Sequence, residues 1–188
     1  MYYLAKILFF LPVKLLMWCK VKNKKLLPQK KAQNFILVCN HLSNFDVFLL
    51  VINLPYKIRF VAKKELGKSK FMSWFLRVCN VILIDRDNPS IESIKEMLKA
   101  AKNNEILGIF PEGVRNKTKE KLLEFKGGFE KIAEKTNTPL LILTINKKPR
   151  LFRLTTIDVL GLYYCDRETD NIQVVKLKML ESLQGDKK

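Results

Sequence analysis

From residue 34 onward the chain alternates short apolar runs with longer amphipathic stretches, and this order constrains the fold more than any other feature. Apolar runs of four to six residues bounded by turns are typical of buried strands, whereas apolar residues spaced three or four apart are typical of helices. Parallel strands need a crossover of a dozen or more residues, usually a helix. The sequence therefore predicts an α/β domain with a mixed, largely parallel central sheet flanked by helices, and with antiparallel edges near the C-terminus.

The expected elements follow one another in a regular order. Strands are expected at residues 35–39, 58–62, 81–84, 106–110 and 140–145, and helices at 45–54, 71–79, 90–103 and 125–136. Two further strand-like runs cover residues 151–159 and 172–177. The chain has 188 residues, of which 48% are apolar, and this is enough for one domain with a sizeable core.

The first 19 residues are almost continuously apolar and rich in aromatic side chains, and a basic cluster follows them. Lys6 and Lys14 interrupt the apolar segment and Pro12 kinks or breaks a helix, which disfavours a clean transmembrane span. At about 100° per residue, Lys6, Lys14 and Lys20 share one third of the helix surface. We therefore expect an amphipathic helix lying in a membrane surface, and a helix that caps the domain's own core is the alternative.

The same reasoning gives the expected domain organisation. Residues 1–25 form the interfacial membrane helix and basic cluster, residues 26–183 form the main domain, and residues 184–188 form a flexible tail. No small-x-small cleavage site follows the apolar segment, which disfavours a cleaved signal peptide.

The charge balance points to an anionic partner. Lys and Arg number 35 against 18 Asp and Glu, which gives a formal net charge of +17. Nucleic acid, an anionic membrane surface and phosphorylated substrates all fit such a charge. The basic residues are spread along the chain, and no helix-turn-helix, zinc or RNA-recognition signature accompanies them. We expect no nucleic-acid partner, and a nucleic-acid-binding module is the rival class.

The four cysteines are widely scattered and form no C-x-x-C pair. A single histidine cannot complete a zinc site with them, so no metal is expected, and reduced, mostly buried thiols are the simplest interpretation. Cys39 lies two residues before His41, which raises the possibility of a thiol nucleophile. In a strand, however, the Cys39 side chain is expected to point into the core.

His41 is the only histidine of the chain and follows the expected strand at 35–39. Asp46 comes five positions later and could orient the imidazole ring if the chain turns back between them. Ser43 and Asp46 also match an S-x-x-D capping box for the following helix, which explains these two residues without catalysis. The box does not explain His41, which makes His41 the candidate general base.

Two more polar segments follow expected strands. Arg86 ends the segment Ile-Asp-Arg, and Glu112, Gly113 and Arg115 occur in a Pro-Glu-Gly-Val-Arg turn. Gly113 allows the backbone to approach a ligand, and the guanidinium of Arg115 is suited to phosphate. Any one segment is also compatible with an ordinary polar turn. Three such segments at strand ends favour a shared site, because ligands of α/β sheets bind there.

These segments resemble the sequence blocks of the glycerolipid acyltransferase family, typified by 1-acylglycerol-3-phosphate O-acyltransferase. The resemblance covers residues 34–160. The N-H-x-S-x-x-D block matches Asn40, His41, Ser43 and Asp46, and the I-D-R block matches residues 84–86. The F-P-E-G block matches residues 110–113, with Arg115 after it, and residues 60–66, 125–128 and 138–140 resemble three looser blocks. The departures from the family pattern are Lys70, Asn80, Val114 and Asn116.

The resemblance implies a mechanism and residue roles. His41 would be the general base and Asp46 would orient its ring, with Asn40 and Ser43 in support. The acceptor site would be lined by Lys63, Arg86, Glu112, Gly113 and Arg115, the cations binding phosphate. The acceptor oxygen would attack an acyl thioester directly, without an acyl-enzyme, and backbone N–H groups are expected to stabilise the thioester oxyanion. A protein with a decayed site is a second rival, and the intact His41, Asp46, Glu112 and Arg115 argue against it.

The resemblance also implies substrates and location. The expected reaction moves a fatty acyl group from a thioester to the free hydroxyl of 1-acylglycerol 3-phosphate (lysophosphatidic acid), making phosphatidic acid. Another lysophospholipid or glycerol 3-phosphate stays open as the acceptor, because Val114 removes a hydroxyl beside Arg115. No cofactor is expected beyond the donor, which is acyl-CoA or acyl-carrier protein. Membrane lipids are the expected partners, with the protein peripheral or monotopic on the cytoplasmic face of a membrane.

Overall fold

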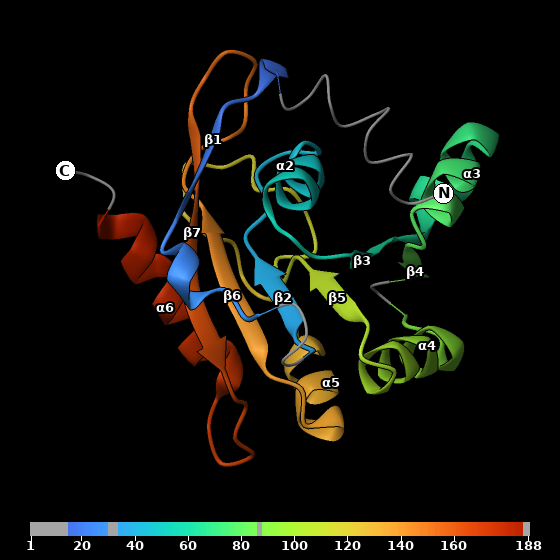
Figure 1. Ribbon diagram of the computed structural model, residues 1–188. Coiled ribbons are helices and arrows are strands. Elements are labelled where there is room, and N and C mark those ends of the chain that lie inside the picture. Colours follow the sequence, from blue (N-terminus) through green and yellow to red (C-terminus); the bar gives the residue numbers. More distant parts are fainter. Residues whose placement is uncertain (1–14, 30–33, 86–87, 186–188) are drawn as a thin grey trace.

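The computed structural model describes residues 15–29, 34–85 and 88–185 (Figure 1). Its strands are β1 (Cys19–Lys22), β2 (Ile36–Cys39), β3 (Ile58–Lys63), β4 (Ile82–Ile84), β5 (Ile106–Ile109), β6 (Leu140–Ile145) and β7 (Thr155–Tyr163). Its α-helices are α2 (Asp46–Asn53), α3 (Lys70–Val78), α4 (Ile91–Lys102), α5 (Phe129–Thr136) and α6 (Asn171–Gly185). Two 3₁₀ helices, η1 (Lys24–Leu26) and η2 (Lys64–Lys68), complete the described elements.

The predicted α/β class is confirmed. The seven strands form one sheet in the order β1-β7-β6-β2-β5-β3-β4. Strands β6, β2, β5, β3 and β4 run parallel to one another, whereas β7 is antiparallel to β6 and carries β1 parallel to it. The parallel majority and the antiparallel edge near the C-terminus are both as the sequence predicted.

Strand β2 lies in the middle of the sheet and shows why the core has two halves. All four of its residues are fully buried, as expected of a parallel strand covered on both faces. Leu37 and Cys39 pack with the apolar face of α2, whereas Ile36 and Val38 pack with α4, α5 and α6. Figure 1 shows α2 on one side of the sheet and α4, α5 and α6 on the other.

The carboxyl ends of the parallel strands meet at one edge of the sheet. Val38 of β2 pairs with Ile109 of β5, and Lys63 of β3 pairs with Ile84 of β4. The polar segments that follow these strands therefore leave the sheet side by side, although they are far apart in the sequence. This edge is where ligands bind in open α/β sheets.

The chain near the C-terminus differs from the sequence prediction. Residues 172–177 were expected to form a strand, but they belong to helix α6. Val175 and Met179, four residues apart, are fully buried on one side of this helix. The apolar residues of this stretch satisfy the helical spacing as well as the strand spacing, and packing against the sheet decides between them. Because α6 extends to Gly185, it also includes the first two residues of the expected tail.

Two other elements begin later than expected. The strand expected at residues 151–159 is β7, which starts at Thr155, and residues 151–154 form an exposed loop before it. The helix expected from residue 125 is α5, which starts at Phe129 because Gly128 has a φ of +118° that no helix accommodates. Asn80, at a family glycine position, has a φ of +55°, a conformation that Asn tolerates better than most residues.

The N-terminal part of the sheet was not predicted. The sequence assigned residues 19–25 to the membrane helix and its basic cluster, but Cys19–Lys22 is strand β1 and Lys24–Leu26 is η1. Val21 is buried while Lys20 and Lys22 lie at more accessible positions, so the basic residues alternate with inward ones as strand geometry requires. The sheet thus begins before residue 26. Residues 1–14, which make up most of the predicted membrane helix, lie outside the described residues.

Candidate active site

The side chains of His41 and Asp46 are in direct contact. Nδ1 of His41 lies 2.8 Å from Oδ2 of Asp46. The same oxygen accepts the backbone N–H groups of Leu42, at 2.6 Å, and of Ser43, at 2.7 Å. A carboxylate only accepts hydrogen bonds, so Nδ1 carries the proton and Nε2 of neutral His41 has a free lone pair. The turn that the sequence required between His41 and Asp46 is therefore present.

Ser43 and Asn40, the other two residues of the N-H-x-S-x-x-D block, support the turn. The hydroxyl of Ser43 accepts the backbone N–H of Phe45 at 3.3 Å, while its own N–H is held by Asp46. Only half of the predicted S-x-x-D capping box is present: Asp46 accepts the N–H of Ser43, but α2 begins after Phe45, and the hydroxyl of Ser43 bonds Phe45 rather than the N–H of Asp46. The Asn40 amide bonds both backbone groups of Ile145, at 2.7 and 3.0 Å, and so fixes the end of β2 against the end of β6.

The side chain of Glu112 contacts the backbone of His41. One carboxylate oxygen accepts the N–H of His41 at 2.8 Å, and the other accepts the N–H of Leu123 at 2.9 Å. The Glu112 side chain is buried, and burial raises its pKa above the ordinary value, against the lowering effect of these two hydrogen bonds. The sequence placed Glu112 in an acceptor-binding site, which stays a prediction, and the structure shows that both of its oxygens accept backbone N–H groups.

Two residues that sequence reasoning missed complete the support of His41. The ring of Phe110 stacks on the imidazole, with ring centroids 4.1 Å apart and an interplanar angle of 19°. The backbone N–H of Asn116 donates to the carbonyl of His41 at 2.7 Å. No spacing rule points to either contact, because the pairing of strands β2 and β5 brings together segments that are far apart in the sequence.

Gly113 and Arg115 follow Glu112 in the turn after β5. Gly113 has a φ of +69°, and a Cβ at this position would lie 3.0 Å from the side chain of Lys126, so the turn requires glycine. The Arg115 side chain is exposed at the same edge, and no described residue forms an ion pair with it. Its guanidinium is therefore available to an anionic ligand.

Lys63 lies farther along the same edge, at the end of β3. Its Nζ is 3.5 Å from Oε1 of Glu65, and both side chains are well exposed, so this pair constrains Lys63 only weakly. Residue Arg86 lies outside the described residues, although Lys63 pairs in register with Ile84, two positions before it. The strands thus place the β3 and β4 segments next to each other.

An apolar cavity of about 280 Å³ opens beside the site, between the sheet and helices α4 and α5. Phe110, which stacks on His41, also lines this cavity, together with Gly113 of the turn. Most of its other walls are aliphatic or aromatic; they include Val61, Ile84, Met97, Ile109 and Phe129. Phe110 thus contacts the imidazole of the candidate base and also lines the apolar cavity.

The cysteines take no part in this arrangement. Cys39 is fully buried, and burial together with the charges of Asp46 and Glu112 raises its pKa well above the ordinary value. This disfavours the thiol nucleophile that the sequence left open. Among the described residues, no group of His, Cys, Asp and Glu side chains is arranged to hold a metal ion. Nor does any described helix combine the length and apolarity that a membrane crossing requires.

Known proteins resemble the chain in sequence and in fold. The family model named acyltransferase matches residues 19–146. A 1-acyl-sn-glycerol-3-phosphate acyltransferase of Bacillus subtilis is 39% identical over 123 residues, which are 65% of this chain and 59% of the bacterial protein. One from Cocos nucifera is 39% identical over 127 residues, which are 66% of this chain and 41% of the plant protein. The chain thus aligns with less than two thirds of each relative.

The fold comparison agrees with the sequence comparison. The crystal structure of a 1-acyl-sn-glycerophosphate acyltransferase from Thermotoga maritima superposes with a TM-score of 0.73, over 90% of this chain and 72% of that one. The two are 24% identical, so this likeness concerns the fold. The family match covers well over half of the chain and includes the His41, Asp46 and Glu112 segments described above. The chain therefore belongs to the acyltransferase family.

Proposed function

We propose that the protein transfers a fatty acyl group from a thioester donor to the free hydroxyl of 1-acylglycerol 3-phosphate, making phosphatidic acid. The hydrogen bond between His41 and Asp46 is the observation that carries this proposal. It leaves Nε2 of His41 free to remove the hydroxyl proton, and the Asp46 carboxylate stabilises the imidazolium that forms. The relatives from Bacillus subtilis and Cocos nucifera bear the name of this activity.

The atoms balance in a single displacement. The acceptor oxygen forms a bond to the acyl carbon while its proton passes to Nε2 of His41. The carbon–sulfur bond then breaks, and the thiolate leaves with that proton. No covalent enzyme intermediate is needed, consistent with the burial of Cys39 and with the use of Ser43 in the turn.

The surroundings of His41 support these substrates. The cavity beyond Phe110 is apolar enough for an acyl chain, whose burial is favourable at about 25 cal/mol per Å². Arg115 and Lys63 are cations at the same edge and are suited to the phosphate of the acceptor. We include Arg86 with them on the strength of the I-D-R match alone. Acyl-CoA and acyl-carrier protein both fit as donors, because both present a thioester.

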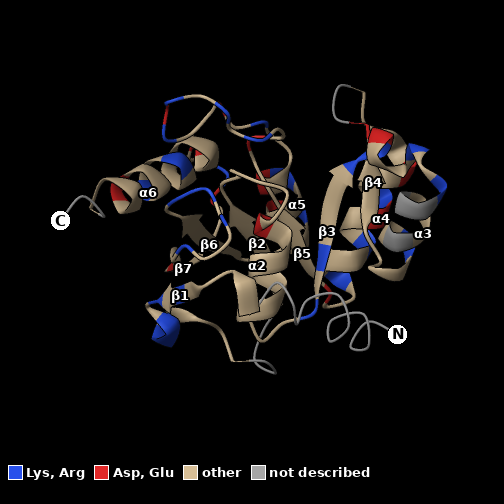
Figure 2. Cartoon of the chain, turned by 90° about the horizontal axis from the view of Figure 1, so that it is seen from above, with Lys and Arg blue, Asp and Glu red and all other residues tan. Residues whose placement is uncertain are grey.

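We further propose that the protein acts at a membrane surface, on its cytoplasmic face, with the apolar and basic N-terminal segment as one anchor. Both the acceptor and the product are lipids, and the +17 charge favours anionic headgroups. The nucleic-acid alternative has weaker support, because Lys and Arg are distributed over many elements around the molecule rather than gathered on one (Figure 2).

The decisive experiment is acyl transfer to lysophosphatidic acid by the purified protein and by His41→Ala. The variant should lose about 10²–10⁴-fold in kcat, since no second imidazole can replace His41. Circular dichroism should show that it remains folded. A panel with glycerol 3-phosphate and other lysophospholipids identifies the acceptor. Near-full turnover by folded His41→Ala would refute the mechanism, and no transfer by the wild-type protein to any acceptor would refute the function.

A further inference from the structure

The loop between β6 and β7 exposes apolar side chains that the described part of the chain leaves uncovered. Leu151, Phe152 and Leu154 are each more than half exposed. Leu15, Leu16 and Trp18, which precede β1, are exposed next to them. The backbone joins the two segments, because the N–H of Phe152 donates to the carbonyl of Leu16 at 2.7 Å and Thr155 donates to Trp18 at 2.9 Å. We call these six residues the apolar patch.

The backbone at the tip of this loop is strained. Phe152 has a φ of +57°, a left-handed conformation that is unfavourable for a residue with a bulky side chain. Burial of the Phe152 ring against the described residues does not offset this strain, because the residue is 64% exposed. An aromatic ring held outward at the cost of strain indicates a contact with something outside the chain.

Cations surround the apolar patch. Lys147, Lys148, Arg150 and Arg153 are all exposed, and residues 146–155 contain no acidic residue. An aromatic and aliphatic tip with basic residues beside it fits the interface of an anionic bilayer. There the apolar side chains enter the acyl region while the basic heads contact lipid phosphates.

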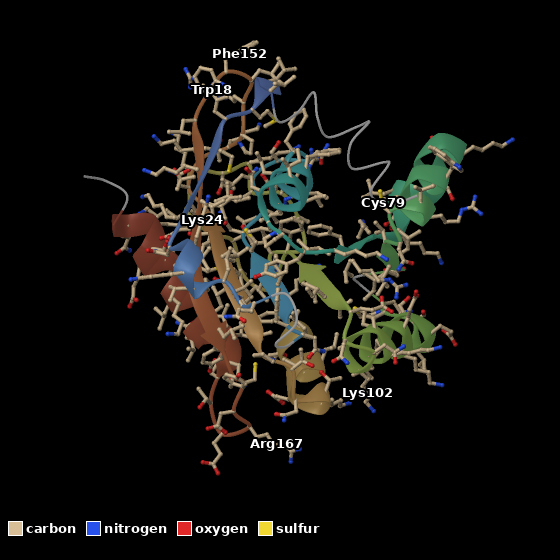
Figure 3. The ribbon with its side chains drawn as sticks, in the orientation of Figure 1. Trp18, Lys24, Cys79, Lys102, Phe152 and Arg167 are labelled. Atoms are coloured by element: carbon tan, nitrogen blue, oxygen red, sulfur yellow. The ribbon has the colours of Figure 1, made fainter. Side chains whose placement is uncertain are left out.

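The apolar patch lies on the edge of the sheet that carries the candidate active site. Strand β7 starts at this edge because it runs antiparallel to β6, and the loop leaves from the end of β6. Asn40, next to His41, is bonded to Ile145 at that same end. Figure 3 shows Trp18 and Phe152 together at one extremity of the molecule, with Lys102 and Arg167 toward the opposite end.

From these observations we infer that the β6–β7 loop, together with Leu15, Leu16 and Trp18, is a membrane-docking surface that inserts into an anionic bilayer. Docking through this edge turns the His41 segment toward the lipids. The benefit of that orientation rests on the proposed function, whereas the docking itself does not. The surface belongs to the folded domain, so it fixes an orientation that an N-terminal anchor alone does not fix.

A tryptophan reporter tests insertion directly in the full-length chain. The protein has two tryptophans, Trp18 and Trp74. Replacing both by Phe and introducing Phe152→Trp leaves one reporter at the tip of the loop. Vesicles with anionic lipid and brominated acyl chains should quench this reporter strongly. The matched reporter Leu177→Trp, on the exposed side of α6, should stay unquenched.

Two outcomes of the reporter experiment would overturn the inference. The first is a reporter at 152 that stays unquenched while the protein sediments with the vesicles, which would assign attachment to another segment. The second is a blue-shifted emission at 152 before vesicles are added and unchanged by them. In that case the chain's own N-terminal residues or a second copy would cover the apolar patch, and sedimentation velocity would tell these two apart.

Partition measurements give an independent test. Phe152→Gly removes the ring and suits the positive φ, so vesicle binding should fall about tenfold while the melting temperature is not lowered. The control Leu177→Ala should bind as the wild type does. Arg150→Gln with Arg153→Gln should weaken binding about fivefold per charge, and Lys102→Gln with Arg167→Gln removes the same charge from the opposite end. Equal losses in both pairs would show a general charge effect and refute the surface.

The inference and the proposed function can fail separately. Quenching of the reporter in a protein that transfers no acyl group would refute only the function. Transfer to lysophosphatidic acid in detergent, without quenching in vesicles, would refute only the docking surface.

Discussion

The carboxylate of Glu112 accepts the backbone N–H of His41 at 2.8 Å, across 71 positions of the sequence. The contact joins the turn after β5 to the turn after β2. It fixes the backbone of the histidine, while Asp46 fixes its ring. Glu112 is therefore a positioning residue for the candidate base, and the variants below separate the contributions of the two carboxylates.

Glu112→Gln should impair His41 without touching its side chain. Both oxygens of Glu112 accept backbone N–H groups, and glutamine replaces one oxygen by an NH₂ group that cannot accept. One buried N–H then loses its partner, at a cost of about 1–3 kcal/mol. We expect lower thermal stability and lower kcat, measured by calorimetry and acyl-transfer assays. Glu181→Gln, exposed on α6, is the control and should change neither.

The pH dependence of stability should report the burial of Glu112. Its pKa is raised in the folded protein, so between its ordinary value of 4.5 and the raised value the native state binds more protons than the unfolded state. The contribution of Glu112 to stability is thus complete below pH 4.5 and is lost as the pH rises through the raised value. Unfolding measured across this range should show that slope in the wild type and less of it in Glu112→Gln. Identical slopes would argue that Glu112 does not titrate abnormally.

Asp46→Asn should keep the turn and lose the charge. Oδ2 of Asp46 accepts all three hydrogen bonds described for this side chain, and Oδ1 is buried without a partner among the described residues. An asparagine carbonyl can take the Oδ2 position and preserve the Nδ1–H tautomer of His41. We expect kcat to fall about 10²-fold with little change in KM, because a neutral amide does not stabilise the imidazolium. A loss confined to KM would contradict this role.

Arg115→Ala should weaken the use of a phosphorylated acceptor more than that of the thioester. A lost charged hydrogen bond is worth roughly 1.5–3 kcal/mol, so the acceptor KM should rise about 10–100-fold. Arg115→Lys should rescue poorly, since an ammonium lacks the planar fork. Arg167→Ala, at an exposed position toward the far end of the molecule, is the matched control (Figure 3). Equal losses with phosphorylated and unphosphorylated acceptors would make Arg115 a structural residue.

Gly108→Ala should disturb the site from within the core. A Cβ at Gly108 in β5 would lie 2.7 Å from Ile58 and from the ring of Phe60. Phe60 stacks in turn on Phe110, the neighbour of the His41 imidazole. We expect a loss of about 1–3 kcal/mol in the free energy of unfolding, measured by denaturant titration, and reduced activity. Gly185→Ala, where a Cβ meets nothing within 4 Å, should be neutral.

Local sequence patterns determined most of the fold. The buried strands and amphipathic helices between residues 35 and 145 occur in the predicted order, because each has a strong period of its own. The predictions failed where the pattern was compatible with two structures. Residues 172–177 satisfy both helix and strand spacing, and the Lys-Val-Lys segment before residue 23 looks equally like a basic cluster and an edge strand. Contacts with β6 and β7 decide these cases.

The contacts of the candidate site likewise fall into those that the sequence predicts and those that only the tertiary structure shows. The sequence by itself determined the pairing of His41 with Asp46, because five residues and one turn suffice to bring the side chains together. Only the tertiary structure decided that Glu112 holds the His41 backbone and that Phe110 stacks on the imidazole. The physical reason is that these contacts arise from strands β2 and β5, which are adjacent in the sheet, although their paired residues are 71 positions apart in the chain. No local pattern encodes a distance across a sheet.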